Sequence, residues 1–175
     1  MARRPNRAEQ AAADLLDSLG IDIVPVPVAK IAKELGVILQ YEPLEGGMSG
    51  VLFRGEADRP VMGINELHAD VRQRFTIAHE LGHLQLHKDA LYVDGLVRRD
   101  AESSLALNSQ EIEANAFAAE LLMPRKLVLQ EITKRVPEGG VAEAAKLVRQ
   151  MAKSFEVSEQ AMEFRLVNLG LATSF

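Results

Sequence analysis

Apolar residues recur every three or four positions in two stretches near the start of the chain, which predicts two helices. These stretches cover residues 7–19 and 28–35, and each is followed by a glycine. Glycine is common just after a helix because it adopts the left-handed backbone conformation without steric cost. The segment between them, residues 21–28, contains two prolines and is predicted to be extended, because proline excludes a helix.

A different pattern follows, in which short apolar, β-branched runs are separated by turn-forming residues. The runs are 37–41, 50–55 and 59–65, with glycine, aspartate and proline between them. This pattern is typical of strands and predicts a small antiparallel sheet. The run at 50–55 is also a candidate for holding an extended substrate peptide through main-chain hydrogen bonds.

The second half of the chain has mainly helical periodicity. One helix is predicted from Asp70 to about His87, opened by a capping box between Asp70 and Gln73. Residues 88–108 have no clear period, and so long a connection is usually functional or mobile. Further helices are predicted for residues 109–123, 124–136, 141–155 and 158–169, with a hinge at 136–140 and Ser158 as an N-cap.

The helix that begins at Asp70 carries an H-E-x-x-H motif, formed by His79, Glu80 and His83. Residues four apart lie on nearly the same face of a helix, about 6 Å apart along its axis. The two imidazoles can therefore bind one metal ion, as two of the three protein ligands of a catalytic Zn²⁺ site. Glu80 lies beside this pair, where a carboxylate acts as general base toward the attacking water.

Two histidines on a packed helix can also have a purely structural role, with each ring bonded to a backbone carbonyl. The neighbouring residues argue against this interpretation. One side of the helix is lined by Phe75, Ala78, Gly82 and Leu86, and another by Ile77, Leu81 and Leu84. The helix should therefore be buried on most faces, and two histidines and a glutamate there would be costly without a strong partner.

The composition restricts the chemistry further. Of 175 residues, 47% are hydrophobic and 26% are charged, as in an ordinary globular domain, and the net charge of −5 argues against a broad nucleic-acid-binding surface. The absence of cysteine excludes thiol chemistry and cysteine-based zinc sites, so a metal must use histidine and carboxylate ligands. No signal peptide or membrane-spanning apolar run is recognisable, and we expect a cytoplasmic protein.

The third metal ligand is expected on the next helix, where two glutamates compete. Glu111 shares a face with two alanines and Asn115, whereas Glu113 points about 200° away from Glu111. The alanines would let this helix approach the motif helix, and Asn115 could bond the outer nitrogen of a ligand imidazole. This geometry favours Glu111, although Glu111 also fits a capping arrangement with Asn108, and Glu113 fits a solvated face.

Two segments, FTIAHELGHLQLH at 75–87 and EIEANAFAAELLMP at 111–124, together resemble the ImmA/IrrE family of bacterial zinc metallopeptidases. The similarity extends from the predicted sheet to the last helix. It implies that His79, His83 and Glu111 are zinc ligands and that Glu80 is the catalytic glutamate. Family members with known roles cleave helix-turn-helix repressors, so the resemblance implies such a repressor or an antitoxin as the protein substrate.

Other residues near the motif have weaker claims. His87 lies about 12 Å along the axis from His79, too far to share its ion, and is expected to end the helix or line the cleft. Tyr92, Arg98 and Arg99 lie in the long connection and could stabilise the oxyanion of peptide hydrolysis. For these three, a role as solvated loop residues is the simpler interpretation.

The sequence therefore predicts an α+β fold, with helices packed around a small antiparallel β-sheet, a zinc site between two helices and a C-terminal helical hairpin. Residues 1–136 would form a zinc metallopeptidase-like domain, and residues 137–175 a helix-turn-helix-like extension packed on it. The expected function is a zinc-dependent endopeptidase that relieves repression by cleaving a repressor or antitoxin.

Two alternatives stay open. The protein could bind a repressor or antitoxin through the same cleft without cutting it, but a pure binder has no need of Glu80 beside the metal. It could also bind DNA through its last two helices, but the second of these carries Glu159 and Glu163, with only Arg165 as a basic residue. No direct contact with nucleic acid or membrane is therefore expected.

Overall fold

The computed structural model describes residues 4–54, 59–87, 91–93, 101–135 and 144–172. Its helices are α1 (Arg7–Ser18), α2 (Val28–Glu34), α3 (Asp70–Leu86), α4 (Ala101–Leu122), α5 (Arg125–Arg135), α6 (Ala144–Phe155) and α7 (Glu159–Asn168). Its strands are β1 (Ile38–Glu42), β2 (Gly50–Phe53), β3 (Val61–Asn65) and β4 (Leu91–Val93). The fold is α+β, as predicted.

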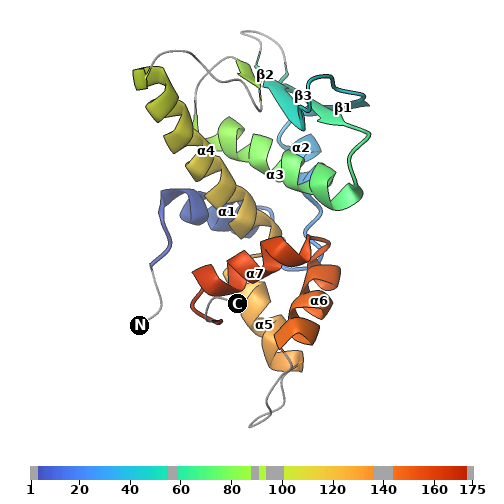
Figure 1. Cartoon of the computed structure of the whole chain (residues 1–175), viewed down its shortest axis with the longest axis vertical. Coiled ribbons are helices and arrows are strands. Elements are labelled where there is room, and N and C mark those ends of the chain that lie inside the picture. Colours follow the sequence, from blue (N-terminus) through green and yellow to red (C-terminus); the bar gives the residue numbers. More distant parts are fainter. Residues whose placement is uncertain (1–3, 55–58, 88–90, 94–100, 136–143, 173–175) are drawn as a thin grey trace.

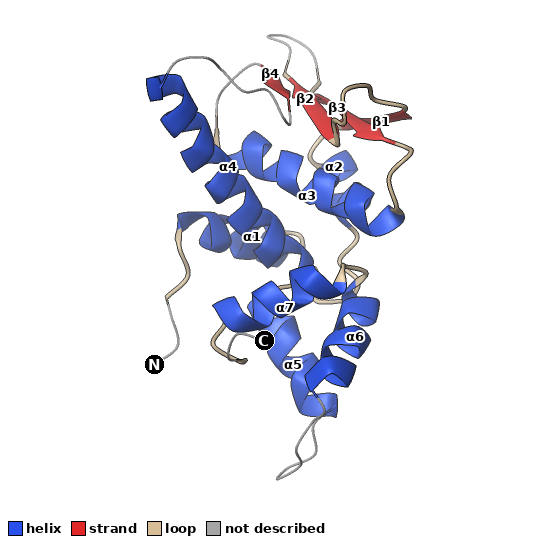
Figure 2. Cartoon of the chain, viewed as in Figure 1, coloured by secondary structure: helices blue, strands red, loops and turns tan. Residues whose placement is uncertain are grey.

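The sheet lies at one end of the molecule, and helices form the rest (Figure 2). Helix α3 runs along the sheet and contacts β2 and β3, while α4 crosses α3 and also packs against α1 (Figure 1). Helices α5, α6 and α7 gather at the end away from the sheet. A single hydrophobic core joins the two ends, because it includes Ile64 of β3, Leu81 of α3, Phe117 of α4 and Met162 of α7.

The sheet is mixed, so the prediction of a purely antiparallel sheet is wrong. Its strand order is β1-β3-β2-β4, in which β2 is antiparallel to both of its neighbours and β1 is parallel to β3. The parallel pair arises because β3 inserts between β1 and β2, which follow each other in the chain but do not pair. Each of residues 51–53 is paired on both sides, so β2 cannot accept a substrate strand there, contrary to expectation.

The predicted connection at 88–108 contains more regular structure than its sequence pattern indicated. Strand β4 pairs with β2 within it, and α4 begins at Ala101 rather than at residue 109. Asn108 therefore lies inside a helix and does not cap one. Residues 101–107 include alanine, glutamate and leucine, which favour helix, and the polar residues at 108–110 do not interrupt it.

The remaining helices, α3 included, begin and end close to their predicted residues, but the predicted cap of α3 differs from the observed one. Ser158 caps α7 by accepting a hydrogen bond from the N–H of Ala161 (3.1 Å), as expected. The capping box predicted for α3 is wrong, because Ala69 is the N-cap and no side chain bonds to the first turn. Gln73 instead donates to the carbonyl of His68 (2.7 Å). Asp70 is the first helical residue, where its charge interacts favourably with the helix dipole.

Two expectations are not tested by the fold. The predicted hinge at 136–140 and the proposed domain boundary fall within residues 136–143, outside the described residues, so the division into two domains stays a prediction. Across the portion of the chain described above, no helix is both long enough and apolar enough to cross a membrane.

A buried cation ties the C-terminal helices to the rest of the molecule. Arg165 of α7 is only 2% exposed, and its guanidinium pairs with Glu120 of α4 and lies 3.6 Å from the carboxylate of Glu9 in α1. Its Nε also donates to the carbonyl of Met123 (3.0 Å). A buried ion pair contributes little net stability, but removing one partner leaves an uncompensated charge in the core.

We therefore predict that Arg165→Met lowers the free energy of unfolding by about 3–5 kcal/mol, because Glu9 and Glu120 would stay buried without their cation. The matched control is Arg149→Met, which removes an exposed arginine paired with Glu159 and should cost less than about 1 kcal/mol. Urea unfolding of both variants measures the difference. Equal losses would show that the Arg165 cluster has no special role.

Candidate metal centre

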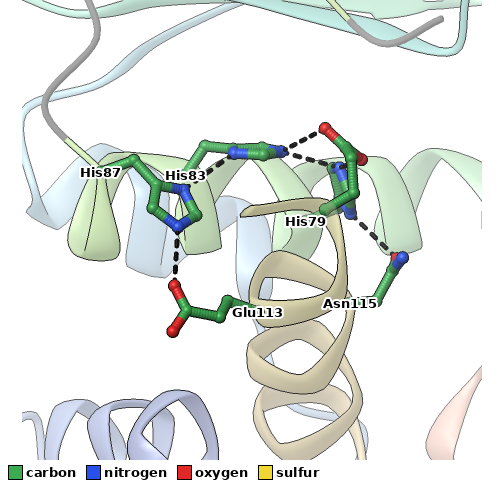
Figure 3. A network of polar contacts seen from close by, with 6 residues as sticks. His79, His83, His87, Glu113 and Asn115 are labelled. Carbon is green, nitrogen blue, oxygen red and sulfur yellow. Dashed lines mark hydrogen bonds and ion pairs between the residues drawn. The ribbon is translucent and has the colours of Figure 1, made fainter. Parts of the chain in front are cut away.

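The three motif residues lie in the buried part of α3. Between residues 76 and 83 every side chain of this helix is buried, and His83 and Glu80 are each only 1% exposed. The polar face of α3 is not solvated, because α4 covers it (Figure 3). The expectation that this helix is buried on most faces is confirmed for residues 76–83.

Both motif histidines face Glu111, on α4. Its Oε2 lies 3.1 Å from Nε2 of His79, its Oε1 lies 3.2 Å from Nε2 of His83, and the two imidazole Nε2 atoms are 3.0 Å apart. Each carboxylate oxygen thus faces one imidazole, and the three residues form a donor triangle in which one ligand atom from each lies within 4.8 Å of the others. Zinc bound tetrahedrally at its usual 2.0–2.1 Å separates neighbouring ligand atoms by about 3.3 Å, so the donor set fits such an ion.

The close packing of α3 against α4 makes this convergence possible. A Cβ placed on Gly82 would lie 2.9 Å from the Cα of Ala114, shorter than real contacts allow, and 3.1 Å from its carbonyl oxygen, tighter than most real contacts. Only glycine therefore fits at position 82, one residue before His83. Ala114, which Gly82 meets on α4, lies about one turn after Glu111. The small residues expected to permit a close approach are present on both helices.

Asn115 orients the first ligand. Its side-chain Oδ1 lies 3.1 Å from Nδ1 of His79 and can only accept, so Nδ1 of that ring carries the proton. When this imidazole is neutral, its lone pair is therefore on Nε2, the atom that faces Glu111 and His83 (Figure 3). The predicted hydrogen bond from an outer imidazole nitrogen to Asn115 is confirmed.

The protonation states at the site suit a metal. For Glu111, burial acts to raise the pKa, but hydrogen bonds and charge interactions with His79 and His83 together outweigh burial and hold the pKa at about 2. For His83, burial is the main cause of a lowered pKa, because it disfavours the charged imidazolium. A carboxylate and a neutral imidazole, the forms favoured for Glu111 and His83, are forms that bind a metal ion.

A cavity of about 290 Å³ opens beside the donor triangle. Its lining consists of Ser49, Arg72, Phe75, Thr76, His79, Glu111 and Asn115. Glu80 is not part of this wall, and its Oε1 lies under the backbone of Gly50, where a Cβ would come within 3.2 Å of it. The role of Glu80 as a general base therefore stays a prediction.

The structure gives partners to two residues whose roles the sequence left open. His87 is the C-cap of α3, as expected, but its ring also contacts both His83 and Glu113. Glu113 does point away from Glu111, yet it is only 32% exposed and does not lie on a fully solvated face. Of the oxyanion candidates, the side chain of Tyr92 and residues 98 and 99 lie outside the described part of the chain.

Sequence reasoning missed two arginines at the site. Arg72 lines the cavity and is held by hydrogen bonds to Oγ of Ser49 (2.8 and 3.3 Å). Arg54, just after β2, donates to the carbonyls of His83, Leu84 and His87 (2.8–3.2 Å) and so satisfies the C-terminal end of α3. Arg72 could have been suspected from its position on the motif helix, but nothing in the sequence indicates the contacts of Arg54.

Comparison with known proteins agrees with this geometry. A sequence model of the IrrE N-terminal-like domain, a peptidase family, matches residues 32–167, which include the motif and Glu111. The radiation response metalloprotease IrrE of Deinococcus radiodurans is 33% identical over 132 residues. That similarity covers 75% of this chain but 37% of the relative, so the chain spans little more than a third of that protein's length.

We predict that the purified protein carries about one Zn²⁺ per chain, because three donors converge as a catalytic site requires. His79→Ala, His83→Ala and Glu111→Ala should each lose the ion, since two ligands rarely retain it. Glu159→Ala removes an exposed carboxylate on α7 and should leave the metal content unchanged. Elemental analysis after gel filtration measures all four variants, and stoichiometric zinc in the ligand variants would refute the assignment.

Proposed function

The chain belongs to the ImmA/IrrE family of metallopeptidases, and on that basis we propose that it is a zinc-dependent endopeptidase that cleaves a helix-turn-helix repressor or an antitoxin. The observation that carries the proposal is the triangle of His79, His83 and Glu111 beside a cavity. Two histidines and a carboxylate, with room left for water, are the ligand set of many zinc peptidases.

Each residue then has a defined task. A zinc ion held by His79, His83 and Glu111 would supply the Lewis acidity that activates a water and polarises the scissile carbonyl. Glu80 takes the proton from the attacking water and passes it to the leaving amine. Arg72 is the cationic side chain on the cavity wall and is placed to bind a backbone carbonyl of the substrate.

A second cavity supports a polypeptide as substrate. It has a volume of about 570 Å³ and shares Arg72, Phe75 and Asn115 with the cavity at the metal centre. It extends along α4 to α7, where it is lined mainly by apolar side chains, among them Leu122, Ala161 and Phe164. Phe164 is 62% exposed, which is unusual for so large an apolar residue. A protein segment could thus contact apolar surface well beyond the scissile bond.

The alternative of DNA binding loses support from the packing of α7. Arg165 is the basic residue of that helix, and its guanidinium is buried against Glu9 and Glu120, where it cannot reach a phosphate. The opening turn of the helix carries Glu159, which repels a phosphate backbone. A repressor protein is therefore the better partner.

The remaining alternative is a regulator that binds without cutting, and Glu80→Gln separates it from the enzyme. This substitution keeps the size of the side chain but removes the base, so zinc and repressor binding should persist while cleavage falls by roughly 10²–10⁴-fold. The assay incubates each protein with a helix-turn-helix repressor from the same genome and follows the repressor by gel electrophoresis and mass spectrometry, with and without a chelator.

The contrary result is equally specific. If the wild-type protein relieves repression in cells while the repressor stays intact, and Glu80→Gln does so equally well, the protein is a binder. Thr133→Ala, on α5, is a suitable control for the purified proteins because its hydroxyl bonds only within its own helix (2.9 Å to the carbonyl of Leu129).

A further inference from the structure

A line of polar contacts leads away from the metal centre on the side opposite Asn115. Nδ1 of His83 lies 3.1 Å from Nδ1 of His87, and Nε2 of His87 lies 3.0 Å from Oε2 of Glu113 (Figure 3). His83 and His87 are both buried, and Glu113 is partly buried. The line therefore runs from a candidate zinc ligand on α3 to a carboxylate on α4.

The direction of these hydrogen bonds follows from chemistry. If Nε2 of His83 is to bind a metal, its lone pair must be on Nε2 and its proton on Nδ1. Nδ1 of His87 must then accept the hydrogen bond that Nδ1–H of His83 donates. The proton of the His87 ring is therefore on Nε2 of His87. That Nε2–H is the group facing Glu113, and a carboxylate can only accept. Every contact in the line is thus satisfied in one arrangement.

We propose that His87 and Glu113 are positioning residues that fix His83 in its metal-binding tautomer and strengthen its Nε2 as a donor. The inference rests on the proposed zinc site, and it assigns no metal contact to either residue. A carboxylate behind a ligand imidazole raises the basicity of that imidazole, and here His87 transmits the effect over one more ring.

The two candidate ligands are therefore supported differently. His79 is held by the neutral amide of Asn115, whereas His83 is held by an imidazole and a charged carboxylate. The backbone that carries His83 and His87 is also held in place, because Arg54 donates hydrogen bonds to the carbonyls of both residues. Arg7 lies 3.9 Å from the carboxylate of Glu113, and the 72% exposure of the arginine side chain makes that ion pair weak.

Three substitutions test the proposal through zinc affinity. His87→Phe keeps a ring but removes the acceptor, and it should weaken zinc binding about 10–100-fold, the usual effect of losing such a partner. His87→Gln keeps both an acceptor and a donor and should restore most of the affinity. Glu113→Ala should fall between the two, while Glu159→Ala is the matched control on an exposed site. Competition with a chromophoric chelator gives the zinc dissociation constants.

A second readout does not require metal. Long-range ¹H–¹⁵N NMR spectra of the metal-free protein report which nitrogen of each histidine carries the proton. Wild type and His87→Gln should carry a proton on Nδ1 of His83, whether or not Nε2 also carries one beside Glu111, and His87→Phe should lose this preference. Circular dichroism and thermal unfolding of each variant check that the fold is retained.

The outcomes separate the proposals. Unchanged zinc affinity in a folded His87→Phe variant, or an Nδ1 of His83 that carries no proton in the metal-free wild type, would overturn the positioning role. If the wild type binds no zinc but its His83 tautomer depends on His87, the proposed function fails while the hydrogen-bonding arrangement stands. If His87→Phe does not fold, Glu113→Ala decides, because its site is partly exposed and tolerates truncation.

Discussion

The candidate metal centre depends on the crossing of α3 and α4 at Gly82 and Ala114. The backbones approach so closely that a Cβ on Gly82 would lie 2.9 Å from the Cα of Ala114. Glu111 precedes this crossing by one turn of α4, and His79 and His83 flank it on α3. Since a carboxylate side chain spans only a few ångströms, helices held apart by even one methyl group would not bring all three donors together. The tight crossing is therefore a condition for the donor triangle.

Three arginines, one buried and two partly buried, hold the elements around this crossing. Arg54 fixes the C-terminal end of α3 from the sheet, and Arg74 fixes its first half by donating to the carbonyls of Val26 (2.9 Å) and Glu156 (3.2 Å). Arg165 connects α7 to α1 and α4. Guanidinium groups suit this work because five donors in a planar fork can satisfy several carbonyls at once. The candidate metal centre is thus supported by side chains that do not line the cavity beside it.

Much of the candidate site could be predicted because it depends on helical geometry alone. The spacing of His79 and His83 places two imidazoles on one face, and the same periodicity selects Glu111 rather than Glu113 and predicts the contact of Asn115 with His79. The sequence specifies locally which residues share a helix face, and the need for a third ligand then pairs the face of Glu111 with that of the histidines. What no local pattern determines is which residue of a second helix faces a given residue of the first, so the contact between His87 and Glu113 could not be foreseen.

The errors in the predicted fold have the same origin. Strand pairing depends on distant parts of the chain. The pattern within each segment therefore could not predict the parallel β1–β3 pair or the position of β4 beside β2. β4 has only three residues, too few for a pattern of alternating polarity to be recognised. The burial of Arg165 is a further case, since in the sequence it reads as an ordinary exposed cation.

The central claim is that His79, His83 and Glu111 bind one zinc ion. X-ray absorption at the zinc K-edge tests it directly, because the spectrum reports the type and distance of the ligand atoms. The account predicts two imidazole nitrogens and at least one carboxylate oxygen at about 2.0–2.2 Å in a four-coordinate environment. The claim would be contradicted if the protein did not bind zinc when zinc is supplied. A spectrum with only oxygen ligands and no imidazole signal would also contradict it.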